Sequence, residues 1–111
     1  MRTTPEFNYT ISVEFDDTPV RGNAMASGHA DYDTQVEDEI LSRLKWNDVW
    51  AWAVVTVTAS IDGIDLVGTD TLGACTYDDE NDFTSGSYFI DMCDESRADL
   101  MAKIKAVKEV N

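Results

Sequence analysis

The densest group of possible metal ligands in this sequence is the run Asp78-Asp79-Glu80-Asn81-Asp82. Hard cations such as Ca²⁺ bind clustered carboxylate oxygens, so this run is the first candidate for a metal site. An EF-hand loop that started at Asp78 would place Phe83 where a glycine is required and Phe89 where a bidentate glutamate is required. The motif therefore fails, and we interpret the run as a solvated acidic loop, with calcium binding of some other geometry as the alternative. The sequence predicts no metal or cofactor site.

Nucleophilic catalysis would need a cysteine or serine beside a base, and the sequence offers one histidine, His29, with two cysteines, Cys75 and Cys93. No serine lies in a G-x-S-x-G elbow, and no glycine-rich phosphate loop is present. We expect both cysteines to be reduced core residues. The sequence predicts no catalytic residues and no enzymatic activity. A metal-dependent enzyme is an alternative that would require several carboxylates converging in one pocket.

Trp50 and Trp52 could form an apolar interface for a partner or a ligand. The competing interpretation, which we favour, places them in the core or at a subunit interface. Stacking on nucleic acid is disfavoured, because no Lys or Arg occurs between Trp46 and Ser96.

Charge is the most unusual property of the chain. Twenty-two acids face eight bases, for a formal net charge of −14. Such a chain repels phosphates, which argues against direct binding to nucleic acid or to an anionic membrane and predicts a basic protein partner. The candidate partner-binding acids are those of the base-free stretch around the predicted hairpin and the acidic loop: Asp62, Asp65, Asp70, Asp78, Asp79, Glu80 and Asp82.

The element expected to carry these acids is a β-hairpin from Trp50 to Cys75. Its first arm alternates with a period of two, and both sides are largely apolar, which predicts a central strand covered on both faces. Asp62-Gly63 predicts a type I′ turn. Gly68 is a candidate β-bulge.

Four further elements are predicted. Alternation over 7–15 indicates a half-buried strand, and 20–26 is expected to return as a second strand. A capping box, Thr34 to Glu37, predicts a helix that ends near Asn47 and buries Val36, Ile40, Leu41 and Leu44. The stretch 77–92 is expected to be irregular and to cover apolar surface. A last helix over 94–107 would bury the stripe Cys93, Leu100, Met101, Ile104 and Val107.

The predicted fold is therefore α+β, a single domain over 1–111 in the order ββαββα. Its four strands would form one antiparallel sheet with both helices on one face. The N-terminus lacks the apolar segment of a secretory signal and no run is long enough to span a membrane, so we expect a cytoplasmic protein.

The second half of the chain resembles a tract of small acidic proteins of phages and mobile elements that have no assigned activity. The tract comprises Trp50-Ala51-Trp52, the run 55–59, Asp70-Thr71-Leu72-Gly73-Ala74-Cys75, Asp82-Phe83 and the run 88–92. The resemblance implies a phage-type accessory protein that binds host machinery, and it carries over no site residues.

Two functions follow from these observations. The first is a non-enzymatic acidic binding protein that occupies a basic cleft of a host protein by imitating nucleic-acid charge. The alternative is a structural or self-associating domain, such as a homodimer, whose acidity reflects solubility or salt adaptation. Binding that weakens steeply with salt distinguishes the first function from the second.

Overall fold

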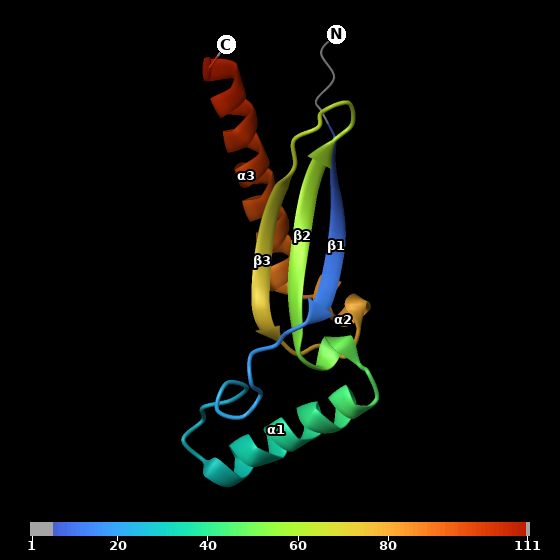
Figure 1. Ribbon diagram of the computed structural model, residues 1–111, viewed down its shortest axis with the longest axis vertical. Helices are drawn as coiled ribbons and strands as arrows, with labels where there is room; N and C mark the ends of the chain where they lie inside the picture. The colour runs from blue at the N-terminus through green and yellow to red at the C-terminus, as the bar shows by residue number, and fades with distance from the viewer. Residues whose placement is uncertain (1–5, 111) are drawn as a thin grey trace. The chain divides into compact units, whose positions relative to one another are not determined.

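A computed structural model describes residues 6–110, in which three antiparallel strands form one sheet in the order β1-β2-β3 (Figure 1). The strands are β1 (Phe7–Phe15), β2 (Ala53–Ile61) and β3 (Gly68–Cys75). The helices are α1 (Ala30–Lys45), α2 (Glu80–Thr84) and α3 (Ser87–Val110), with a 3₁₀ turn, η1, over Val49–Ala51. The α+β class and the central position of β2 are confirmed.

The described residues divide into two compact units, each assembled from separate stretches of chain. Unit 1 contains 6–12, 56–71 and 84–110, and unit 2 contains 13–55 and 72–83.

The alternation of β2 buries one face of the strand far more than the other. Ala53, Val55, Val57 and Ala59 are fully buried, whereas the residues between them are half-buried. On that second face the hydroxyls of Thr56 and Thr71 lie 3.1 Å apart across β2 and β3. The prediction that both faces are covered therefore holds for one face only.

In unit 1, the long helix α3 packs directly on the start of β3. A Cβ added to Gly68 would overlap the carbonyl oxygen of Ser96 and the amide nitrogen of Leu100. Leu100 and Ser96 are fully buried at this contact, and the Arg97 guanidinium lies 5.8 Å from the centre of the Phe7 ring. Gly68 is thus needed for close approach of two backbones, not for the predicted bulge.

In unit 2, α1 packs on the segments that flank the strands. Ile40 is buried against Val20, Ala51 and Trp52, and the other members of the predicted stripe, Val36, Leu41 and Leu44, pack around this cluster. The predicted stripe of α1 is confirmed. The residues of this cluster lie outside the three strands.

The predicted four strands and ββαββα order are wrong, because the chain turns where 20–26 was expected to be a strand. The backbone N–H groups of Asn23 and Ala24 both donate to the carbonyl of Val20, and Gly22 has a φ of +81°. A glycine in this left-handed conformation reverses the chain instead of extending it. The observed order is β1, α1, β2, β3, α2, α3.

Three predicted boundaries also change. Helix α1 begins at Ala30 with His29 as N-cap, four residues before the predicted capping box. The hairpin turn has a positive φ at Gly63 and an Ile64 N–H to Ile61 carbonyl bond, which is the pattern of a type II turn and not of type I′. Asn47, with a φ of +61°, does end the α1 segment as predicted.

The stretch 77–92 is largely helical and not irregular. It contains α2 and the first turns of α3, which begins at Ser87, seven residues before the predicted start. The inner face of α3 runs through Met92, Ser96 and Leu100 at intervals of four. Met101 and Val107, predicted to be buried, are each 48% exposed. Met101 lies off this line, whereas Val107 lies on the same face of the helix, seven residues beyond Leu100.

Candidate partner-binding surface

The acidic loop of unit 2 forms the start of helix α2. The Asp79 carboxylate accepts a hydrogen bond from the Asp82 N–H at 2.8 Å, and the Asp82 carboxylate accepts one from the Asp78 N–H at 2.9 Å. These reciprocal bonds satisfy backbone donors that a helix start leaves free. Asp78 and Glu80 are exposed, and their side chains take no part in these bonds. The run therefore separates into two capping carboxylates and two free ones.

The hairpin acids belong to unit 1 and differ in exposure. Asp62 and Asp65 are exposed in the connection between β2 and β3, and Asp62 accepts a hydrogen bond from the Asn8 side chain at 3.0 Å. Asp70 lies within β3 and is half-buried. Asp62 and Asp65 are thus the accessible members of this group.

The two candidate tryptophans lie in the interior of unit 2. Trp52 is 2% exposed, and its indole N–H donates to the Thr18 carbonyl at 2.7 Å. The half-buried Trp50 ring packs against Phe83 and Tyr77, with ring centres 5.7 and 6.3 Å away. The exposed tryptophan is Trp46, 85% accessible at the end of α1, which sequence reasoning did not single out.

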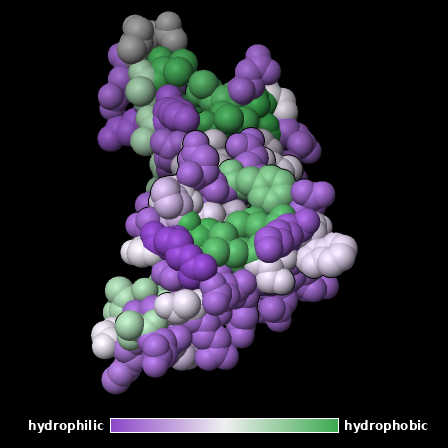
Figure 2. All heavy atoms as spheres, turned by 60° about the horizontal axis from the view of Figure 1, so that its bottom comes forward, coloured by the Kyte–Doolittle hydropathy of each residue, from purple (hydrophilic) through white to green (hydrophobic). Residues whose placement is uncertain are grey.

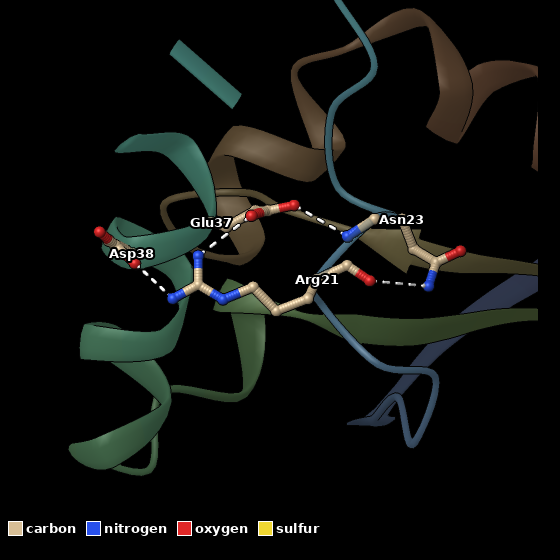
Figure 3. A network of polar contacts seen from close by, with 5 residues as sticks. Arg21, Asn23, Glu37 and Asp38 are labelled. Carbon is tan, nitrogen blue, oxygen red and sulfur yellow. Dashed lines mark hydrogen bonds and ion pairs between the residues drawn. The ribbon is translucent and has the colours of Figure 1, made fainter. Parts of the chain in front are cut away.

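A charged network joins the turn after Val20 to the middle of α1 (Figure 3). The buried Glu37 carboxylate accepts from the Gly22 N–H at 2.8 Å and from Arg21 at 3.0 Å, and Arg21 also reaches Asp38 at 2.6 Å. The bond from Gly22, then the one from Arg21, lowers the pKa of Glu37, since both favour the charged carboxylate. Glu37 is thus not part of a capping box as predicted, because its partners, Arg21 and Gly22, lie outside the helix.

Asp16 performs a similar role at the end of β1. Its carboxylate accepts from the Thr18 N–H at 2.8 Å and the Ala74 N–H at 2.7 Å. These backbone donors lower the pKa of Asp16. Ala74 has a φ of +54°, so Asp16 holds a strained residue of β3 in place.

The possible nucleophiles are poorly suited to catalysis. Cys75 is buried, and burial raises the pKa of its thiol to about 11. Burial also raises the pKa of Cys93. Both cysteines are free thiols, as predicted. Among residues 6–110, no three His, Cys, Asp or Glu side chains converge into a group that could hold a metal ion.

The bases of the described chain are mostly neutralised internally. Of the seven Lys and Arg residues within 6–110, five form ion pairs with six carboxylates. The other sixteen carboxylates in this range have no Lys or Arg partner within it. Thirteen acids and three bases lie in unit 2, against nine acids and four bases in the described part of unit 1.

Hydrophilic residues cover much of the face shown in Figure 2, with hydrophobic residues between them. None of the helices within 6–110 is long and apolar enough to cross a membrane. Comparison of the chain with protein-family models, with curated protein sequences and with solved structures found no match.

Proposed function

We propose that this chain is a non-enzymatic, cytoplasmic binding protein, a phage-type accessory that occupies the basic cleft of a nucleic-acid-binding host protein. The observation that supports it is the surplus of carboxylates: within residues 6–110, sixteen have no basic partner, while five of seven bases are already paired. A cleft built for phosphates offers Lys and Arg side chains, which bind carboxylates with the same charge-assisted hydrogen bonds.

The accessible carboxylates among the predicted partner-binding acids fall into one group in each unit. In unit 1 the group is Asp62 and Asp65, and in unit 2 it is Asp78 and Glu80. Asp79 and Asp82 support the group in unit 2 by capping α2. Asp70 is half-buried and is a weaker candidate for contact.

The decisive experiment is capture of host proteins on the immobilised chain at about 50 mM salt, followed by elution with a DNA duplex. At this ionic strength charges act over more than about 10 Å, and 1 M salt shortens that range to about 3 Å. We expect a captured protein to be released both by DNA and by 1 M salt. A captured protein that DNA does not displace and 1 M salt does not release would contradict the proposal.

Two neutralised variants locate the contact. Asp62→Asn with Asp65→Asn tests unit 1, and Asp78→Asn with Glu80→Gln tests unit 2; at least one of them should weaken capture about tenfold. The matched control, Asp38→Asn with Glu109→Gln, removes two charges that already have ion-pair partners. It should leave capture nearly unchanged.

The alternative, acidity as an adaptation to salt, predicts a different result. The chain would capture no DNA-displaceable protein, and its free energy of unfolding would rise up to molar salt because screening removes repulsion between carboxylates.

A further inference from the structure

The outer face of α3 in unit 1 carries a regular stripe that no other element of the described chain covers. Its residues recur at intervals of four and three, the spacing of a coiled-coil seam. We call this the outer stripe: Asp91, Glu95, Ala98, Ala102, Lys105 and Glu109, all exposed. It lies opposite the buried line through Ser96 and Leu100.

An apolar hollow lies at the C-terminal half of this stripe. It has a volume of about 430 Å³ and is lined by Met101, Ala102, Ile104, Lys105 and Lys108. Met101 is 48% exposed at its edge. A flexible methionine side chain from another molecule suits a hollow of this kind, because Met adapts to irregular space.

The charges of the outer face are divided between its ends. The acids Asp91, Asp94 and Glu95 lie in the N-terminal half, and the bases Lys105 and Lys108 lie in the C-terminal half, which also carries the acid Glu109 near its end. A second α3 placed antiparallel would bring each acidic half against a basic half. A parallel copy would bring like charges together.

We propose that a second copy of this chain docks on the outer stripe as an antiparallel helix pair, with the two-fold axis beside Met101. In this register Ala98 lies opposite Ala102 of the second copy, and Glu95 lies opposite Lys105. Asp94 then faces Lys108. The same patch serves both molecules, as two-fold symmetry requires.

The central alanines permit close approach of the two helices, and the charged layers set their direction. In the outermost layer, Asp91 lies opposite Glu109 of the second copy. Repulsion between these two carboxylates is weakened because solvent screens them. It is weakened further because the ammonium of Lys105 lies 3.8 Å from the carboxylate of Glu109 in the same chain. The seam is about 28 Å long at 1.5 Å per residue. A contact of that size belongs to the class of weak, reversible interfaces.

Two charge reversals test the register by sedimentation velocity over a range of protein concentrations in low salt. Wild type should dimerise reversibly. Glu95→Lys and Lys105→Glu should each weaken self-association by about tenfold or more, because each places like charges in two symmetric layers. An equimolar mixture of the two variants should form a heterodimer, since it restores both layers.

Matched controls separate this effect from net charge. Glu39→Lys and Lys45→Glu make the same charge changes on α1 in unit 2, and neither residue forms an ion pair within 6–110. They should leave self-association within about twofold of wild type. The far-ultraviolet circular dichroism of all four variants should match that of wild type, because every substituted residue is exposed.

A cysteine cross-link tests the axis. Met101→Cys should form a disulfide-linked dimer under mild oxidation faster than Trp46→Cys, although Trp46 is more exposed. Wild type, with only Cys75 and Cys93, gives the background. Any of three results would overturn the proposal. The wild type could remain monomeric at all concentrations, the mixture of the two variants could remain monomeric, or positions 46 and 101 could cross-link at equal rates.

This dimer does not depend on the proposed basic partner. The charge reversals on α3 leave the accessible acids Asp62, Asp65, Asp78 and Glu80 unchanged, so loss of dimerisation and loss of partner capture are separate outcomes.

Discussion

The two units use their carboxylates in different proportions. In unit 2 they accept hydrogen bonds from backbone N–H groups far along the chain, as Glu37 does from Gly22 and Asp16 from Ala74. In unit 1 Asp99 of α3 does the same with the N–H of Thr69, at 2.9 Å, and also pairs with Lys103. Asp94 and Glu109 of α3 pair with bases one helical turn away. Exposed pairs of the second kind contribute little to stability.

The cores differ as well. Unit 1 depends on a close backbone contact between α3 and Gly68. Unit 2 depends on large side chains, Trp52 in one cluster and Phe83 in an aromatic group with Trp50 and Tyr77. A chain with this many acids can therefore fold when some of its carboxylates take structural roles and the rest remain in solvent.

The largest expected effect is on the aromatic group of unit 2. Phe83 is fully buried, so Phe83→Ala removes packing against Trp50 and Tyr77 and leaves a cavity. We expect a loss of about 4 kcal/mol in the free energy of unfolding, measured by urea denaturation. Tyr88→Ala in unit 1, where the side chain is 58% exposed, is the control and should cost less than about 0.5 kcal/mol. Equal losses of stability in the two variants would contradict the view that unit 2 depends on its buried aromatic side chains.

The next effect tests the backbone contact of unit 1. Gly68→Ala places a methyl group against Ser96 and Leu100, which forces α3 away from β3. We expect a loss of about 3 kcal/mol in stability and faster hydrogen exchange along α3. Gly73→Ala in the same strand meets only the Asp16 carboxylate, at 3.2 Å, and should cost less than about 1 kcal/mol. A harmless Gly68→Ala would contradict the close approach.

A smaller effect concerns acid stability in unit 2. The folded-state pKa of Glu37 lies below its ordinary value of 4.5, so the unfolded chain binds more protons in the window just below that value. The stabilisation by this group is present above about pH 4.5 and is lost as pH falls through the folded pKa. Glu37→Gln should lower stability at pH 7 and flatten its decline below pH 4.5, measured by urea denaturation at each pH. Glu39→Gln, on the exposed side of α1, should leave the pH profile of wild type unchanged.

The smallest expected effect is a difference in labelling rate between the two native cysteines, and it is measured on the wild-type chain without any substitution. Cys75 lies in unit 2 and Cys93 in unit 1. Burial raises the pKa of Cys75 to about 11, and that thiol is also less exposed. At pH 8 we expect iodoacetamide to modify Cys93 several times faster than Cys75. The rate of modification at each cysteine is measured by mass spectrometry of the peptides that contain it. Faster labelling of Cys75 would show that unit 2 opens more readily than its burial indicates.

The local spacing of apolar residues was sufficient to predict several secondary-structure elements. The period of two over Phe7 to Phe15 predicted β1 with its observed bounds, and the apolar alternation of β2 predicted its central position. The 3.6-residue stripe of α1 predicted its contact with the core, and Asn47 predicted its end. These signals are local because side-chain direction within a strand or helix follows from spacing alone.

The remaining errors share a physical cause, which is contact between distant segments. Glu37 looked like a capping residue because its partners, Gly22 and Arg21, lie in another segment. Gly68 looked like a bulge because α3 comes nearly thirty residues later in the sequence. Met101 looked buried because the inner face of α3 is set by where Leu100 meets β3.

The sequence by itself determined the excess of negative charge, the α+β class, the period of the main strands and the apolar stripe of α1. Only the tertiary structure decided which carboxylates are free, because an acid becomes structural when a backbone N–H from elsewhere reaches it. The carboxylates of Asp79 and Asp82 accept hydrogen bonds from backbone N–H groups, whereas no such bond engages the exposed side chains of their neighbours Asp78 and Glu80. Composition does not distinguish these residues, since hydrogen-bond partners are assigned by folding.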